Sequence, residues 1–147
     1  FHGELLGDFS LNVTNHVSFD YLINKGLRRI SLSYDLNSEQ AQALLQNIDP
    51  RLAEVTIHQS MPSFHMEHCV FAAFLSKGKS YRDCGKPCEK HQVQLKDQFG
   101  NTHWIKPDQE CRNTMYNASS QTALPYFHEF KSLGLGHYRF EALHESG

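Results

Sequence analysis

Four cysteines are the residues of this chain best suited to metal chemistry. Cys69, Cys84 and Cys88 lie in the stretch HCVFAAFLSKGKSYRDCGKPCEKH, residues 68–91, and 22 residues separate Cys88 from Cys111. Four thiolates satisfy a [4Fe–4S] cluster, whose ligand spacings vary widely. They also satisfy tetrahedral zinc, although zinc sites more often contain two pairs with two-residue gaps. The spacing therefore favours metal binding over four unrelated buried thiols, and it does not separate iron–sulfur from zinc.

The surroundings of the cysteines favour a reduced, metal-bound state. In CGKPC, Gly85 is conformationally permissive and Pro87 has a fixed φ, which suits a tight loop around a metal. Four cysteines in 147 residues are too few for a disulfide-dense secreted module. We see no basic-then-apolar leader and no apolar run of the about 18 residues that span a bilayer. We therefore expect a cytoplasmic protein with no membrane segment.

Candidate catalytic residues flank two of the cysteines. His65, Glu67 and His68 in SFHMEHC come just after a predicted strand, and the carboxyl ends of strands are where barrel enzymes build active sites. Glu67 is a candidate base, and His65 and His68 are candidate acids or ligands. The alternative is that they support the metal ligands through hydrogen bonds. Arg112, directly after Cys111, is a candidate for binding a carboxylate or phosphate, or else it pairs with a nearby acid.

A basic segment surrounds the middle cysteines. Residues 76–96 contain six Lys or Arg against two acidic residues, in a chain whose formal net charge is −2. We predict that Lys77, Lys79 and Lys86, together with Asn113, bind substrate, and phosphates of RNA are the matching chemistry. The alternative is an ordinary solvated face.

Strand and helix patterns alternate on both sides of the cysteine segment. Alternating or β-branched residues predict strands, and apolar stripes predict helices. The predicted strands are 7–13, 28–34, 54–60 and 137–143, and the predicted helices are 18–26, 37–48 and 122–134. Shorter strands are predicted at 91–97 and 102–106. The order predicts an α/β fold with parallel strands, either half of a barrel or a small open sheet, because a closed (β/α)8 barrel takes about 250 residues.

Several enzyme classes lack their usual motifs here. The chain has no Gly-x-Ser-x-Gly elbow and no Gly-rich phosphate loop. The histidines of HMEH are three residues apart, whereas zinc proteases place them four apart on a helix. A cysteine protease needs an activated thiolate, and none is left if all four cysteines bind metal.

Several motifs in order resemble the U32 peptidase family, the collagenase-like proteases. They are GDFSLNVTNH, FHMEHCVFAAFLSKG, CGKPCEKH and LKDQFGNTHWIKPDQECRNTMYN. The resemblance implies the C-terminal half of a TIM-like (β/α)8 barrel over residues 1–147, with a cysteine-bearing insertion at 61–120 that binds a cluster. It implies a [4Fe–4S] cluster on Cys69, Cys84, Cys88 and Cys111.

The resemblance also implies a range of activities. Family members act in oxygen-independent hydroxylation of RNA bases or of a quinone precursor, with prephenate as an implied co-substrate in the RNA cases. The family's N-terminal half is absent from this chain, so that half, or a second copy of this chain, is an expected partner. The alternatives are a metal-dependent peptidase, and a non-catalytic iron–sulfur or RNA-binding fragment.

Overall fold

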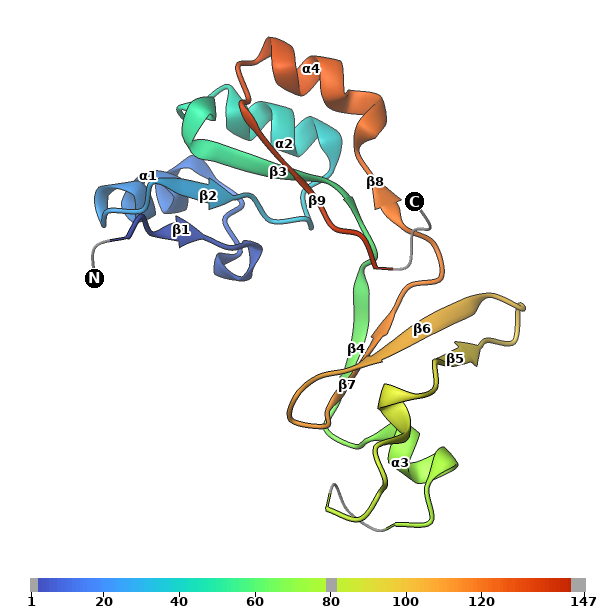
Figure 1. The fold of residues 1–147 in the computed structure, drawn as a ribbon. Coiled ribbons are helices and arrows are strands. Elements are labelled where there is room, and N and C mark those ends of the chain that lie inside the picture. Colours follow the sequence, from blue (N-terminus) through green and yellow to red (C-terminus); the bar gives the residue numbers. More distant parts are fainter. Residues whose placement is uncertain (1–2, 79–81, 144–147) are drawn as a thin grey trace. The chain divides into compact units, whose positions relative to one another are not determined.

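The chain folds as two compact units, each described here by itself. A computed structural model describes residues 3–78 and 82–143. Residues 1–59 and 121–147 make up one unit, which we call the parallel unit. Residues 60–120 make up the other, which we call the cysteine unit (Figure 1). The parallel unit carries a mainly parallel sheet and the cysteine unit an antiparallel one.

The sheet of the parallel unit is built from four parallel strands. They are β1 (Leu6–Gly7), β2 (Arg29–Ser31), β3 (Ala53–Gln59) and β9 (His137–Phe140). β2 pairs with β1 and β3, and β9 pairs with β3, where Glu54 faces His137. A short strand, β8 (Gln121–Thr122), runs antiparallel to the end of β3. Within the described residues this sheet does not close into a barrel.

Helices connect the parallel strands, and side chains cap the starts of the first two. They are α1 (His16–Asn24), α2 (Ser38–Leu45) and α4 (Phe127–Ser132). Asn15 caps α1 by accepting from the Ser18 N–H at 3.0 Å. Asn37 and Gln40 form a reciprocal capping box at α2. Short 3-10 turns complete the unit: η1 (Phe9–Leu11), η2 (Pro50–Leu52) and η4 (Leu124–Tyr126).

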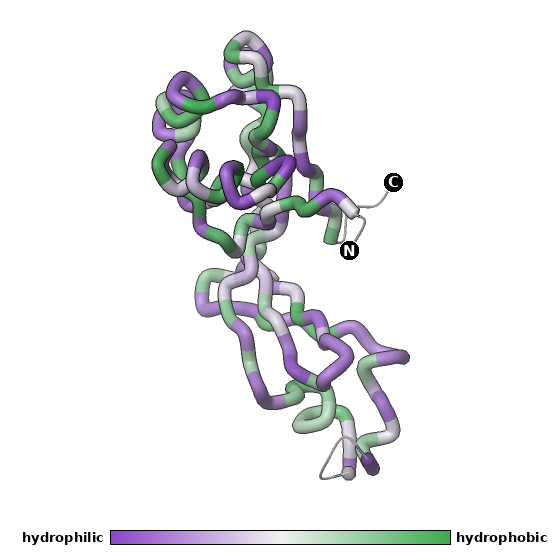
Figure 2. The backbone as a smooth tube through the Cα atoms, turned by 90° about the vertical axis from the view of Figure 1, so that its left-hand side faces the viewer, coloured by the Kyte–Doolittle hydropathy of each residue, from purple (hydrophilic) through white to green (hydrophobic). Residues whose placement is uncertain are grey.

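One face of the sheet packs against these helices. Ile30 and Ala53 from the strands are fully buried together with Phe19 of α1, Leu45 of α2 and Phe130 of α4. Along the helices, hydrophobic residues alternate with hydrophilic ones, as the backbone colouring shows (Figure 2). This amphipathic pattern is what lets each helix bury one side and solvate the other.

The strand residues that alternate with the buried apolar ones form a charged network. Buried Glu54 accepts from the Ser31 hydroxyl at 2.6 Å and from Arg139 Nε at 2.7 Å, and Arg29 Nε lies 3.2 Å away. Burial alone would raise the pKa of Glu54, but these hydrogen bonds and the two guanidinium charges outweigh burial and lower it. The carboxylate is therefore held ionised between three adjacent strands.

The cysteine unit contains a four-stranded antiparallel sheet and one short helix. The strands are β4 (Pro62–Met66), β5 (Val93–Lys96), β6 (Thr102–Pro107) and β7 (Asn113–Tyr116), in the order β4-β7-β6-β5. The helix is α3 (Val70–Leu75), and η3 (Pro87–Glu89) packs against it. The β5–β6 turn is organised by Asp97, which accepts from the backbone N–H groups of Phe99 and Asn101.

The predicted elements are confirmed in outline and corrected in detail. The α/β class, the three helices and strands 28–34, 54–60, 91–97, 102–106 and 137–143 correspond to observed elements. The strand predicted at 7–13 is wrong beyond Gly7. There the Asp8 carboxylate caps η1, and Asn12 turns the chain with a φ of 49°. Among the described residues no helix is long and apolar enough to cross a membrane.

Candidate metal centre

Cys69 is positioned by the junction of β4 and α3. It is the residue before the first turn of α3, and its carbonyl accepts from the Ala73 N–H at 3.0 Å. The next N–H, that of Val70, donates to Asn113 Oδ1 at 2.7 Å. Asn113 begins β7 opposite Met66 of β4. The segment of Cys69 is therefore tied to the strand that follows Cys111.

Cys84 and Cys88 lie in a loop that turns sharply, as CGKPC predicts. Gly85 and Lys86 both adopt left-handed backbone conformations, with φ of 70° and 50°, and Pro87 then starts η3. The Lys86 N–H donates to Cys84 Sγ at 3.4 Å. Backbone N–H groups that point at a cysteine sulfur stabilise it as a thiolate ligand. Because η3 packs on α3, this loop and the start of α3 belong to one local structure.

Cys111 sits in a turn that is held by a single carboxylate. Asp108 Oδ1 accepts from the N–H groups of Glu110 and Arg112, each at 2.9 Å. The Cys111 N–H donates to the Asp108 carbonyl at 3.2 Å. Cys111 itself has a φ of 64°, in the left-handed region that non-glycine residues rarely occupy. Such conformations concentrate at functional sites, where the surroundings hold them in place.

The other three cysteines act electrostatically on Cys111. The pKa of Cys111 is raised, first by burial and then by the charges of Cys69, Cys84, Cys88 and Asp108. No disulfide joins any of the four cysteines, and each is half-buried. Among the described residues, no three His, Cys, Asp or Glu side chains gather closely enough to hold one metal ion.

One buried atom beside the thiols lacks a partner. Asn113 is fully buried, and its Nδ2 is the one buried side-chain nitrogen or oxygen in the described chain that makes no hydrogen bond. A buried donor without an acceptor is costly and calls for an explanation. Asn113 is two residues after Cys111, and its other atom, Oδ1, bonds to the residue after Cys69. An acceptor held between the cysteines, such as a thiolate or an inorganic sulfide, is the chemistry that fits this donor.

Gly78 is a structural residue of the site that the sequence reasoning missed. A Cβ at this position would lie 2.2 Å from the Asp83 carbonyl oxygen and 2.8 Å from Cys84 Cα. The backbone of Gly78 therefore passes directly against the residues that lead into Cys84, and only glycine permits this approach. The KGK sequence around Gly78 gives no sign of this contact. The contact forms only when folding brings Asp83 and Cys84 against Gly78.

The candidate catalytic residues belong to the antiparallel sheet. His65 lies within β4, and its Nδ1 is 3.1 Å from Thr114 Oγ1 of β7. Glu67 follows β4, and its charge acts on Arg112. The expectation that these residues end a strand of the parallel sheet is wrong. β4 comes between β3 and His65, because the chain leaves the parallel sheet after Gln59.

Arg112 pairs with two nearby acids, which is the alternative role predicted for it. Its Nε lies 2.8 Å from Asp108 Oδ2, and its Nη2 lies 2.8 Å from Glu110 Oε2. Hydrogen bonding to Asp108 is the main cause that raises the pKa of Arg112. The guanidinium thus braces the Cys111 turn, and any carboxylate ligand would have to replace Glu110, whose side chain is 70% exposed.

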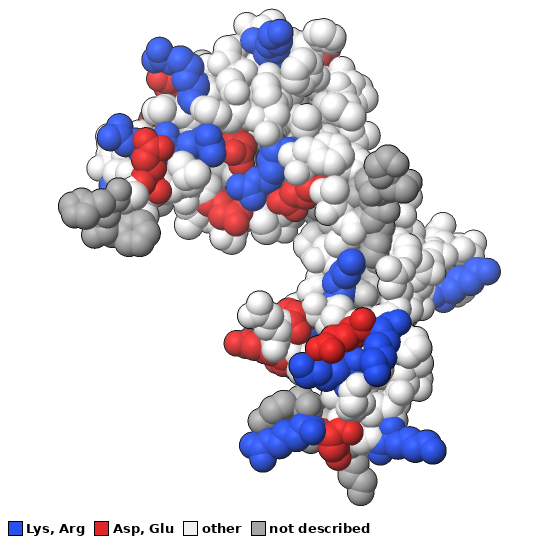
Figure 3. All heavy atoms as spheres, viewed as in Figure 1, with Lys and Arg blue, Asp and Glu red and all other residues white. Residues whose placement is uncertain are grey.

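The basic segment is exposed in the described part of the cysteine unit. Lys77 is exposed, and Lys86 Nζ pairs with Glu89 at 3.0 Å. Lys79 lies outside the described residues. Lys and Arg side chains are spread over the visible face of this unit, with acidic side chains between them (Figure 3). Asn113, predicted to bind substrate, is instead buried beside the cysteines.

Comparison with known families accounts for almost the whole chain. The model of peptidase family U32 matches residues 3–146. The chain belongs to peptidase family U32. The predicted resemblance is therefore confirmed, and this U32 match includes both the parallel unit and the cysteine unit. No curated protein and no solved structure matches the chain.

Family membership leaves the chemistry of this U32 chain open. The family is named for peptidases, but the match specifies no reaction, substrate or cofactor. The metal ligands, the acid and base roles and the RNA contacts therefore stay predictions.

Proposed function

We propose that this U32 chain binds a [4Fe–4S] cluster through Cys69, Cys84, Cys88 and Cys111 and takes part in oxygen-independent hydroxylation of RNA. The observation that carries the proposal is that the charges of Cys69, Cys84 and Cys88 act on Cys111, two residues before Asn113, whose buried Nδ2 has no acceptor among the described residues. When bound, the cluster supplies one-electron chemistry through soft thiolate ligands.

The type and sequence spacing of the cysteines support a cluster. Four thiolates satisfy a [4Fe–4S] cluster, whose ligand spacings vary widely. The gaps between these cysteines differ from the two-residue gaps that zinc sites more often contain. Zinc is the alternative metal.

The residues around the cysteines have separable roles in this proposal. Asp108 and Arg112 hold the Cys111 turn through the 2.8 Å ion pair. Arg112 binds the carboxylate of a co-substrate such as prephenate by exchanging exposed Glu110 for it. Glu67 and His65 are the proposed base and acid at the substrate. Lys77, Lys79 and Lys86 provide charge for the RNA backbone.

We also infer that the parallel unit is half of a (β/α)8 barrel. Parallel sheets are usually covered on both faces. Here helices cover one face, and the other carries the network of Glu54, Arg29 and Arg139. Inward-facing residues of a barrel are covered by the remaining strands. The partner in this proposal is therefore the missing half of the barrel or a second copy of this chain.

The decisive experiment combines metal analysis with product analysis. Protein purified without oxygen should be brown and contain about four iron and four sulfide ions per chain, as four cysteine ligands imply. The full-length parent, supplied with a two-electron acceptor, should convert a C–H bond of an RNA base to C–OH with oxygen from water or from the co-substrate, detected by mass spectrometry of digested RNA with and without prephenate. Stoichiometric zinc without sulfide would refute the cluster. Peptide cleavage by the same preparation, with RNA unchanged, would favour the peptidase alternative.

A further inference from the structure

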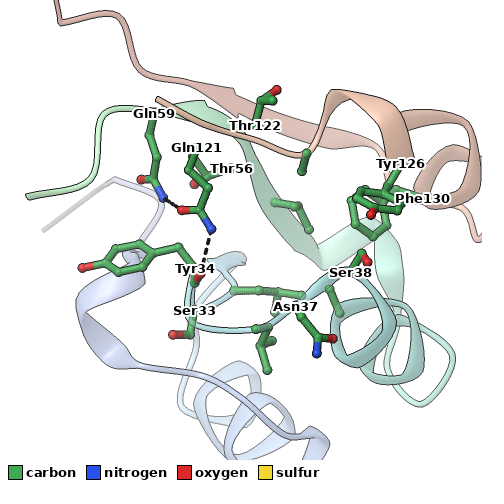
Figure 4. A pocket seen from close by; sticks show the side chains of 15 residues that line it. Ser33, Tyr34, Asn37, Ser38, Thr56, Gln59, Gln121, Thr122, Tyr126 and Phe130 are labelled. Carbon is green, nitrogen blue, oxygen red and sulfur yellow. Dashed lines mark hydrogen bonds between the residues drawn. The ribbon is translucent and has the colours of Figure 1, made fainter. Parts of the chain in front are cut away.

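A cavity in the parallel unit lies at the carboxyl ends of β2 and β3. It has a volume of about 250 Å³ and is bounded by the start of α2 on one side and by η4 and α4 on the other (Figure 4). All of its lining residues belong to the parallel unit. In parallel α/β sheets, ligands bind outside the carboxyl ends of the strands. The cavity is therefore in the place where such a sheet holds a ligand.

The lining of the cavity separates into an apolar floor and a polar rim. The floor consists of buried side chains from the strands and helices: Leu32, Ala41, Val55 and Phe130. The rim carries hydroxyl, phenol and amide groups, including Ser33, Gln59, Gln121 and Tyr126. No lining residue is charged. Because a buried charge without a partner is strongly disfavoured, the part of a ligand that enters must be uncharged.

Two amides and the backbone form a hydrogen-bonding edge on one side of the cavity. Gln59, the last residue of β3, is 4% exposed, and its Nε2 donates to Gln121 Oε1 at 3.1 Å. Gln121 Nε2 in turn lies 3.5 Å from the Tyr34 carbonyl oxygen, a long contact (Figure 4). The Gln121 side chain is exposed, so it is able to exchange this weak contact for a ligand. A carboxamide offers a donor and an acceptor side by side, which matches the edge of a heterocyclic ring.

Aromatic rings lie at the other side of the same cavity. Tyr126 and Phe130 project from η4 and α4 and lie close together opposite the amide pair (Figure 4). Tyr126 is 41% exposed, whereas Phe130 is 1% exposed. An exposed aromatic face next to an apolar floor is suited to stacking a planar ring.

We propose that this cavity binds an uncharged heteroaromatic ring, of the pyrimidine or purine type, with its polar edge on Gln121 and its face against Tyr126. The proposal is independent of the cysteine unit, and it rests on the proposed function only in the choice of nucleosides as probes. A ring of this kind makes few contacts, so we expect a dissociation constant on the order of 1 mM.

The test is titration of the full chain with cytidine, uridine and adenosine, followed by saturation-transfer NMR. Gln121→Leu should weaken binding of the preferred nucleoside about three- to tenfold, because a polar edge loses its partner. Tyr126→Leu should weaken it by a similar factor through loss of stacking. Gln46→Leu, at the exposed C-cap of α2 and outside the cavity, is the matched control and should leave binding unchanged.

The outcomes separate this proposal from the cluster. Circular dichroism checks that each variant is folded, and both tested side chains are exposed enough to be replaced without emptying the core. Absence of saturable binding by all three nucleosides, or equal affinity in Gln121→Leu and Gln46→Leu, overturns the ring site. Benzoate, a charged ring of similar size, should bind more weakly than the preferred nucleoside, and equal binding also overturns it. Iron and sulfide content, which tests the proposed function, is expected to be the same in all these variants.

Discussion

The side-chain oxygen Oδ1 of Asn113 accepts a hydrogen bond from the Val70 backbone N–H at 2.7 Å. This single contact connects β7 to the first turn of α3, and so it connects the segments of Cys111 and Cys69. Asn113 is fully buried, so bulk water cannot readily form a hydrogen bond with either polar atom of its side chain. Its position makes it a structural anchor of the cysteine unit.

Replacing Asn113 by Leu should destabilise the cysteine unit. The Val70 N–H would lose its acceptor, and leaving a buried polar group unsatisfied costs about 1–3 kcal/mol. Trp104 in β6 is the only tryptophan of the chain, so its fluorescence in urea reports on this unit alone. Asn24→Leu at the exposed end of α1 is the control and should leave the Trp104 transition where it is. An unchanged transition in the Asn113 variant would refute the anchoring role.

Replacing Cys84 or Cys88 by Ser should remove most of the iron and acid-labile sulfide from protein purified without oxygen. A hard hydroxyl is a poor substitute for a soft thiolate. Gln109→Ser changes an exposed residue beside Cys111 to the same new side chain and should retain the full content. If the Cys84 and Cys88 variants kept their iron and sulfide, these residues would not be ligands.

Gly78→Ala should reduce iron and sulfide content about as strongly as loss of a cysteine. The new methyl group would meet backbone atoms of Asp83 and Cys84 at 2.2–2.8 Å, and the loop into Cys84 would have to move. Gly136→Ala is the matched control, because nothing lies within 4 Å of a Cβ there. Equal metal content in the two variants would show that the loop tolerates the shift.

Acid should weaken the β5–β6 turn through Asp97. Its pKa is lowered to about 2, first by the side-chain hydrogen bond from Asn101, against a smaller opposing effect of burial. The unfolded value is about 3.9, so the stabilisation is complete above about pH 4 and disappears as the pH falls toward 2. Asp97→Asn removes the titration. The difference between the urea midpoints of wild type and variant, followed by Trp104 fluorescence, should therefore shrink from pH 5 to pH 2.

The control for Asp97 is Asp20→Asn in α1, which should leave the pH dependence of the Trp104 transition unchanged. A gap between wild type and Asp97→Asn that stays constant over this range would mean that the carboxylate charge does not stabilise the turn.

Changing Lys77, Lys79 and Lys86 together to Glu should abolish RNA binding in the full-length parent and leave iron content intact. Each contact with a single-stranded phosphate contributes about −0.7 to the slope of log affinity against log salt. A second variant with all three lysines changed to Ala should therefore have a slope that is less steep by about 2. Lys25, Arg28 and Lys131 of the parallel unit, changed to Glu together, provide a charge-matched control. If the two triple-Glu variants bound RNA equally well, the basic segment would not be the RNA contact.

Local patterns in the sequence were sufficient for much of the fold. The stripes around Phe19, Leu45 and Phe130 predicted the helices, because an amphipathic helix buries residues three and four apart whatever it packs against. The caps at Asn15 and Asn37 are local as well, because capping depends on neighbouring residues only. The same locality explains the tight turn at Gly85 and Pro87 and the family resemblance carried by the cysteine motifs.

Contacts between distant residues decided the rest. The segment after Gly7 looked like a continuing strand, but a capping carboxylate at Asp8 and the left-handed Asn12 turned it. His65 became part of a second sheet only because β7, almost fifty residues later, pairs with β4. The orphaned amide of Asn113, the close approach at Gly78 and the uncharged cavity below Gln121 were likewise beyond sequence reasoning. Burial and approach distance belong to pairs of residues brought together by folding, whereas periodicity and capping belong to a single stretch of chain.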